Sequence, residues 1–245
     1  MASSPGVFPT TCWTLVNRVR DDNAAVRQAA LDELCRAYWL PLYAFARRSG
    51  FDPPDAEDAV QDFFIGALQR DLLARADEQV GKLRNLLCIA FKRHLNHRRR
   101  HEQALRRGGG VEHVPLLPRD AEERYLSVAG ESLESPDQIF HRQWARNLVE
   151  RAQQALRSWY EREGKGALFE RLSAYLPCDS VEAANGEEPL EDRAGMSVDT
   201  FRIARHRMRK RLRECIRSEV RETTQSTDPV LIEAEIRELL QALSA

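Results

Sequence analysis

The sequence contains few of the features that cross-link a chain or anchor it in a membrane. Its five cysteines are isolated from one another, and none belongs to a Cys-x-x-Cys pair (Cys12, Cys35, Cys88, Cys178 and Cys215). A disulfide framework or a cysteine zinc site is recognised by closely spaced cysteines. No apolar run reaches the ~20 residues that a membrane helix needs, and the chain begins without a basic segment followed by an apolar one. We therefore expect reduced thiols, no membrane segment and a cytoplasmic protein.

The sequence also lacks the short motifs of common enzymes. It contains no His-Glu-x-x-His, no Gly-x-Ser-x-Gly and no dinucleotide-binding glycine pattern. Gly164 and Lys165 stand together as in a phosphate-binding loop, but Trp159 occupies the position five residues upstream where that loop has glycine. We expect no catalytic residue and no cofactor, and therefore a protein that is not an enzyme.

A large net charge is absent, since 37 Lys and Arg residues stand against 38 Asp and Glu. Taken alone, this balance argues against a generally nucleic-acid-binding protein. The charges are nevertheless separated along the chain: cations concentrate in 82–107 and 202–217, and acidic residues in 52–62, 120–137 and 179–192. Such alternation indicates different partners for different faces.

Strand patterns are missing, whereas apolar residues recur at helical spacing through most of the chain. The fold class is therefore predicted as all-α. Pro41 either kinks or divides the helix expected over 24–48, and Asp52 caps the helix expected over 53–70. The helix expected over 82–107 ends before three glycines. The expected helices are 24–48, 53–70, 82–107, 136–160, 167–176, 189–194, 197–221 and 229–240.

Residues 108–137 contain glycine, proline and acidic residues in place of a periodic stripe. A structureless stretch of this length is unusual inside one domain, so it is predicted to be a flexible linker. The expected organisation is thus two helical domains, 1–107 and 138–223, followed by an amphipathic extension over 224–245. That extension could either pack on the second domain or contact another protein.

The segment PLEDRAGMSVDTFRIARHRMRKRL has the plan of a helix-turn-helix. Gly195 supplies the turn and Ser197 caps the basic helix that follows. Early positions of such a helix read base edges, and later ones lie nearer the phosphates. We assign Thr200, Arg202 and Arg205 to the first group, and His206, Arg207, Arg209 and Lys210 to the second. A solvated basic helix without a DNA partner is the alternative.

This segment resembles the promoter-reading part of region four in bacterial sigma factors of the extracytoplasmic-function type. The matching residues are Gly195, Ser197, Thr200, Arg202, His206, Arg207 and Arg209. The opening FPTTCWTLV and the long tail are similar to the planctomycete-like subgroup of these factors.

The N-terminal half carries two further resemblances. DAEDAVQDFFIGAL resembles the helix of sigma region two that docks on RNA polymerase, which implies polymerase-binding roles for Glu57, Asp58, Gln61 and Asp62. KLRNLLCIAFKRHLNHRRRH resembles the segment that grips the melted minus-ten element. The residues implied there are Lys82, Arg84, Asn85, Lys92, Arg93, Asn96, Arg98, Arg99 and Arg100.

The resemblance implies a factor that binds core RNA polymerase, at its beta-prime clamp helices and beta flap, and directs it to promoter DNA. An anti-sigma factor is a further candidate partner. The alternatives are a polymerase-independent helix-turn-helix regulator, which would dimerise on a palindromic site, and a helical adaptor that binds no DNA. His94, His97 and His101 are spaced to share one side of a helix, but histidine among arginines commonly contacts nucleic acid, and we expect no metal.

Overall fold

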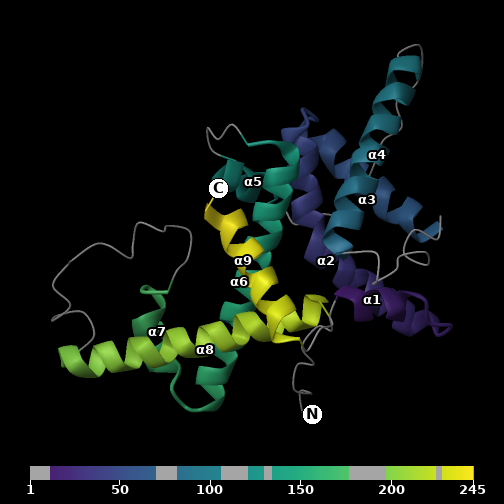
Figure 1. Ribbon diagram of the computed structural model, residues 1–245. Coiled ribbons are helices and arrows are strands. Elements are labelled where there is room, and N and C mark those ends of the chain that lie inside the picture. Colours follow the sequence, from purple (N-terminus) through teal and green to yellow (C-terminus); the bar gives the residue numbers. More distant parts are fainter. Residues whose placement is uncertain are drawn as a thin grey trace. The chain divides into compact units, whose positions relative to one another are not determined.

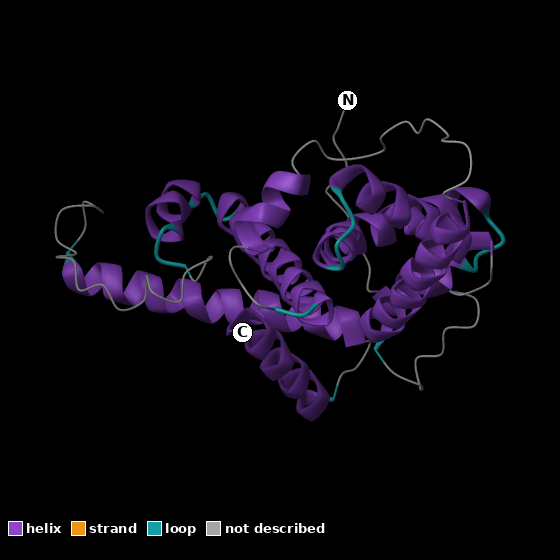
Figure 2. Ribbon diagram, turned by 90° about the horizontal axis from the view of Figure 1, so that it is seen from above, coloured by secondary structure: helices purple, strands orange, loops and turns teal. Residues whose placement is uncertain are grey.

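The computed structural model describes residues 12–69, 82–105, 121–129, 134–176, 197–224 and 228–244. Within these ranges every regular element is a helix, which confirms the predicted all-α class (Figure 2). The helices are labelled in Figure 1. They are α1 (Cys12–Val19), α2 (Ala24–Arg48), α3 (Pro53–Gln69), α4 (Leu83–Leu105), α5 (Ala121–Ala129), α6 (Pro136–Arg162), α7 (Gly166–Ser173), α8 (Val198–Thr224) and α9 (Pro229–Ser244).

None of the helices in the described ranges combines the length and the apolar character needed to cross a membrane. Most of them agree with the sequence prediction to within a few residues. Helix α1 was not anticipated, and the short helix expected at 189–194 lies outside the described residues, as does the glycine turn that follows it.

Polar side chains fix where several helices begin. The Asn23 side chain accepts hydrogen bonds from the amides of Ala25 and Val26 at the start of α2, at 2.9 and 3.4 Å. The Asp52 carboxylate accepts the Asp55 amide at 2.9 Å at the start of α3. Caps of this kind satisfy amide groups that have no partner within the helix.

Helix α6 begins with a reciprocal pair of such bonds. The amide of Gln138 donates to the Ser135 hydroxyl at 3.3 Å, while the Ser135 amide donates to the Gln138 side chain at 2.8 Å. This is a capping box, which satisfies two otherwise unpaired donors at once. The two residues that cap the start of α6 are thus only three positions apart in the sequence.

Helix α2 passes through Pro41 without dividing in two. It ends at Arg48, and Gly50, two residues later, has a φ of +91°, in the left-handed region that residues other than glycine adopt with difficulty. The Phe51 amide then turns back to the carbonyl oxygen of Ala46 at 3.2 Å, which closes the helix and directs the chain into α3.

The helices belong to two compact units. The first contains α1 to α5 and the opening of α6 up to Ala145, and the second contains the rest of α6 together with α7, α8 up to Arg221 and α9. The change from one unit to the other thus falls inside α6, later in the chain than the predicted boundary at residue 138.

Three aromatic rings from three helices meet in the core of the first unit. Phe45 of α2 lies 5.8 Å from Phe91 of α4, centroid to centroid, and Phe63 of α3 lies 5.1 Å from Phe91. All three side chains are buried. Edge-to-face contacts of this kind add to the free energy of burying the rings and hold α4 against α2 and α3.

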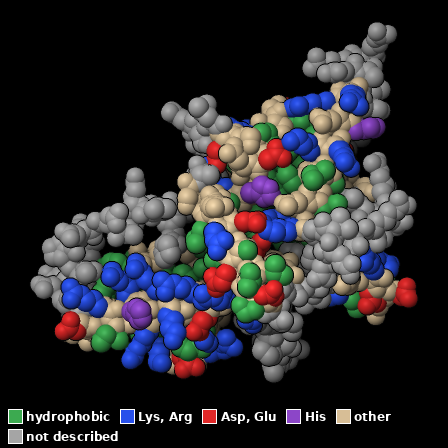
Figure 3. Space-filling view, in the orientation of Figure 1, with side chains coloured by type: hydrophobic (Ala, Val, Ile, Leu, Met, Phe, Trp, Pro, Cys, Tyr) green, Lys and Arg blue, Asp and Glu red, His purple; other side chains and the backbone are tan. Residues whose placement is uncertain are grey.

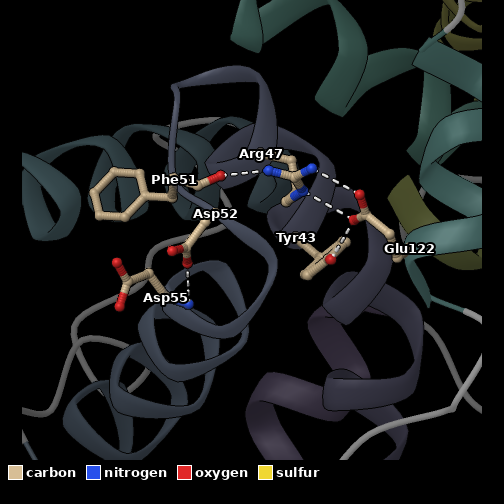
Figure 4. A network of polar contacts seen from close by, with 6 residues as sticks. All are labelled: Tyr43, Arg47, Phe51, Asp52, Asp55 and Glu122. Carbon is tan, nitrogen blue, oxygen red and sulfur yellow. Dashed lines mark hydrogen bonds and ion pairs between the residues drawn. The ribbon is translucent and has the colours of Figure 1, made fainter.

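Helix α5 corrects part of the predicted linker, because residues 121–129 of the 108–137 stretch are helical. Glu122 of α5 receives two hydrogen bonds from the Arg47 guanidinium, at 2.6 and 2.8 Å, and one from the Tyr43 hydroxyl at 2.5 Å (Figure 4). Tyr125 of α5 is buried beside Tyr43, with ring centroids 6.3 Å apart. Tertiary contacts with α2 therefore stabilise a helix whose own apolar stripe is too short to be recognised.

The core of the second unit is built from α6, α7 and α8. Phe169 of α7 packs at 5.8 Å from Tyr160 of α6, and Phe201 of α8 packs at 4.9 Å from Tyr175. The remaining members are aliphatic or small: Ala152, Leu156, Leu172, Leu176, Met208 and Leu212. Helix α8 is thereby anchored along one side and leaves its other side to solvent.

Candidate nucleic-acid interface

Helix α8 begins as the sequence predicts. The Ser197 hydroxyl accepts the amide of Thr200 at 3.3 Å and lies 2.8 Å from the Thr200 hydroxyl. The Phe201 amide donates to the Ser197 carbonyl at 2.9 Å. These bonds confirm the predicted serine cap and hold the first turn of the helix in a defined direction.

The buried side of α8 is apolar and the exposed side is cationic. Phe201, Met208 and Leu212 are buried in the core of the second unit. Most of the residues assigned to DNA binding are exposed: Ser197, Thr200, Arg202, His206, Arg207 and Lys210. Figure 3 shows Lys and Arg side chains following one another along α8 at lower left. A rigid helix with one such face can present several cations at once to a line of phosphates.

Two of the arginines assigned to DNA binding are less exposed than the others. Arg205 is half-buried, and its guanidinium lies 5.8 Å from the centroid of the Phe201 ring. It therefore lies at the edge of the exposed face, next to the core, and its role at base edges stays a prediction.

Arg209 is also half-buried. Burial, together with the charges of Arg205 and Arg213, holds the pKa of the Arg209 guanidinium below its ordinary value. The group is still a cation at neutral pH, because an arginine pKa lies far above that range. It lies at the flank of the cationic face.

Helix α4 has a polar and cationic exposed face of its own. Asn85, Arg93, Asn96 and Arg100 are exposed along it at spacings of three, four and eight residues. Residues at such spacings lie on one side of a helix. The structure thus brings together four of the nine residues predicted to grip the minus-ten strand.

Arg84 does not belong to this face, which corrects the prediction. It is only 6% exposed, and its guanidinium lies 4.3 Å from the centroid of the Trp144 ring within the first unit. Cation–π contacts of a desolvated arginine stabilise the folded protein. Arg84 therefore holds α4 to the opening of α6 and is not accessible to a nucleic acid.

The other cations of α4 already have contacts inside the protein. Lys92 pairs with Asp137 at 2.9 Å, and this contact raises the pKa of the Lys92 ammonium. Arg99 donates to the Ser49 carbonyl and lies 4.9 Å from the centroid of the Phe51 ring. Lys82, immediately before α4, is half-buried.

Arg98 joins α4 to the acidic side of α3. Its guanidinium lies 2.9 Å from the carboxylate of Asp62 and 3.9 Å from those of Asp55 and Asp58. The Arg98 side chain is only 18% exposed. The arginine therefore offsets part of the repulsion among three like charges that follow one another on α3 at one-turn spacing.

Two of the four residues assigned to polymerase binding, Asp58 and Asp62, thus take part in this ion-pair cluster. The other two, Glu57 and Gln61, are half-exposed on α3. Burial, with the charges of Asp58 and Glu122, raises the pKa of the Glu57 carboxyl. All four side chains come from one helix, as predicted, and the face they form is acidic and polar.

The histidines of α4 do not share one environment. The His94 ring packs against Phe63 and Phe91, with centroids 5.8 and 6.1 Å apart, whereas His97 is exposed. The His101 side chain lies outside the described residues. Among the side chains that the structure describes, no group of three His, Cys, Asp or Glu residues could hold a metal ion.

Burial gives two thiols of the first unit a high pKa. The pKa of Cys88 is raised to about 12, mainly by burial and further by the neighbouring Asp137. That of Cys35 is raised to about 11 by burial and Asp32. A thiol reacts as the thiolate, so both groups are poor nucleophiles at neutral pH.

Comparison with protein-family models, with curated proteins and with solved structures found no match to this chain.

Two exposed apolar residues on these faces were missed in the sequence analysis. Ile203 of α8 and Ile89 of α4 are 54% and 51% exposed. Neither residue was singled out as a surface residue from its place in the sequence. Plotting each residue's direction around the helix axis would have separated them from the buried stripe, since both point away from it.

Proposed function

We propose that this chain is a sigma factor of the extracytoplasmic-function type, which binds core RNA polymerase and directs it to promoters with defined minus-thirty-five and minus-ten elements. The observation that carries the proposal is the face of α8. A serine-capped helix, anchored by Phe201, Met208 and Leu212, presents polar and cationic side chains along its exposed side. This is the arrangement that a recognition helix needs in the major groove.

Helix α8 binds the minus-thirty-five element in this proposal. Thr200 and Arg202, in its first two turns, face the bases, while Arg207 and Lys210 lie nearer the phosphates. Arginine reads guanine through two hydrogen bonds, and a serine or threonine hydroxyl can pair with any base. Replacing Arg202 by alanine should cost about 1–3 kcal/mol of discrimination at the contacted pair.

Helix α4 binds the melted minus-ten strand in this proposal. Arg93 and Arg100 would follow the backbone, and Asn85 and Asn96 carry amide groups that can hydrogen-bond an unstacked base. Single-stranded DNA is bound by a cationic track together with groups that contact the bases. The support for this assignment is the exposure of all four residues on one side of α4.

Helix α3 binds the polymerase in this proposal. Its acidic and polar residues, Glu57, Asp58, Gln61 and Asp62, suit a basic surface, for which the beta-prime clamp helices are the proposed partner. The beta flap is the proposed contact of the second unit, and an anti-sigma factor is a candidate regulator. The proposed role lies in the cytoplasm, where the polymerase is, and needs neither a cofactor nor catalysis by this chain.

Run-off transcription tests the proposal directly. Core RNA polymerase is incubated with a library of genomic templates, with and without this chain, and the RNA 5′ ends are mapped. Start sites that appear only when the chain is present, and that share two sequence elements, would support the proposal. RNA 5′ ends that are the same with and without the chain would refute it.

A pair of arginine variants links that activity to α8. Arg207→Ala should lower start-site-specific RNA because it removes one phosphate contact. The slope of log activity against log salt concentration should also become shallower by about one. Arg237→Ala, on an exposed position of α9, is the matched control and should leave both unchanged. Equal effects of the two variants would show that the face of α8 has no particular role.

A further inference from the structure

Ile203 stands at the centre of the exposed face of α8. Successive helical residues are rotated by about 100°, so Ile203 points away from Phe201, Met208 and Leu212, which form the buried side. Its side chain is 54% exposed. Thr200 precedes it by one turn and Arg207 follows it by one turn, both on the same exposed side.

A single exposed isoleucine is common on protein surfaces and needs no explanation by its exposure alone. The position of Ile203 is what requires one. A β-branched residue lowers the stability of an isolated helix relative to alanine, and here it does not belong to the apolar core that offsets such a cost elsewhere in α8. It also interrupts a face that is otherwise polar or charged.

If α8 enters a major groove through this face, the residue at its centre reaches furthest toward the bases. Isoleucine has no hydrogen-bond donor or acceptor, so it cannot read the polar pattern of a base edge. The one apolar group in the major groove is the C5-methyl of thymine. Unmodified DNA carries that methyl on no other base.

We infer that Ile203 is a specificity-determining residue that contacts the C5-methyl group of a thymine in the minus-thirty-five element. The inference rests on the proposed function of α8 as the recognition helix and names one base that it selects. Arg202 and Arg207 flank Ile203 on α8, so the thymine lies next to pairs or phosphates bound by arginine.

The test first selects promoters from templates randomised over the upstream element, using core RNA polymerase and the full chain. A second selection for duplex binding omits the polymerase. Each thymine of the selected element is then replaced, one at a time, by deoxyuridine, which removes only the methyl group. Run-off RNA, or duplex bound in the second format, is measured for the unaltered chain and for Ile203→Ala.

We expect one deoxyuridine position to lower the signal of the unaltered chain by about fourfold, the value for losing one buried methyl group. The same replacement should leave Ile203→Ala unchanged, because that variant has no methyl contact to lose. Leu231→Ala removes a similarly exposed aliphatic side chain from α9 and should respond to deoxyuridine as the unaltered chain does. Alanine favours helix, so Ile203→Ala should keep its helical circular dichroism.

Three results would overturn the inference. A selected element without thymine, or one insensitive to every deoxyuridine replacement, would remove the methyl contact while leaving the sigma-factor proposal intact. If Ile203→Ala lowers the signal relative to the unaltered chain by the same factor on thymine and on deoxyuridine templates, Ile203 contacts a protein and not the methyl group. Absence of any selected sequence, with or without polymerase, would refute the inference and the proposed function together.

Discussion

Gly50 shows how a single residue positions a whole element. Its positive φ lets the chain leave α2 and enter α3 within a few residues, and α3 carries the acidic face. A β-carbon added there would meet only Arg99, at 3.9 Å, so the space is adequate and the backbone conformation is the constraint.

We predict that Gly50→Ala lowers the free energy of unfolding by about 1–2 kcal/mol, the cost of a left-handed conformation for a residue with a β-carbon. Gly166→Ala is the matched control. Gly166 opens α7 without a positive φ, and its added β-carbon would approach only the Glu161 side chain, at 3.8 Å. The control should be neutral or slightly stabilising. Urea titration followed by circular dichroism measures both, and equal effects would contradict the argument.

Glu122 makes the attachment of α5 dependent on pH. Its hydrogen bonds from Arg47 and Tyr43 hold the pKa of the carboxyl below its ordinary value of about 4.5. Because the folded-state pKa is lowered, the carboxylate contributes stability above the unfolded pKa. That contribution is lost as the pH falls through the folded value.

Glu122→Gln should therefore lower the free energy of unfolding at neutral pH by roughly 1.5–3 kcal/mol, the range for hydrogen bonds to a charged group. The difference between the two proteins should shrink as the pH falls below the ordinary value. Glu123→Gln, one residue along α5 on its exposed side, is the control. A constant difference at every pH would mean that the charge of Glu122 is not what stabilises α5.

At the scale of elements, α3 and α4 depend on each other through Arg98. The three carboxylates of α3 repel one another, and the guanidinium from α4 offsets that repulsion. The acidic face proposed to bind polymerase therefore exists in its present form only while α4 is packed beside it.

Arg98→Gln should lower the free energy of unfolding by about 1 kcal/mol, a modest value because two of the three carboxylates are half exposed. The loss should be smaller in high salt, which screens the remaining repulsion. Arg100→Gln, at an exposed position on the same helix, is the control for stability. Urea titrations at low and high salt provide the measurement, and a salt-independent loss equal to that of Arg100→Gln would contradict the assignment.

At the scale of the whole molecule, the cationic faces of α4 and α8 belong to a chain whose net charge is only −1. Phosphate contacts dominate affinity for DNA, and the acidic segments elsewhere in the chain oppose them. If the chain acts as the proposed sigma factor, this balance means that it needs the polymerase to bring both faces onto one promoter.

Gel shifts should therefore show tight, promoter-specific binding only when core polymerase is present. Size exclusion without polymerase should show a monomer, whereas a polymerase-independent regulator would dimerise and bind a palindromic site by itself. Tight specific binding of the free chain, together with a dimer, would favour that regulator.

The helices of the candidate interface could be predicted from local sequence, because their signals are local. The cap at Ser197 and the cap at Asp52 both act within one turn, and the structure confirms them. Helix α5 was not predicted, because Glu122 is held by Tyr43 and Arg47, which lie 79 and 75 residues away in the chain. No local pattern encodes a contact over that distance.

The sequence by itself determined the helical class, the ends of most helices and the segments in which charge collects, because these follow from periodicity, capping and composition. Only the tertiary structure decided which cations are on the surface. Arg84 and Arg100 look alike in the sequence, yet one is packed on Trp144 and the other is exposed. Burial depends on which helices pack together, and that choice is made by the whole core and not by any single segment.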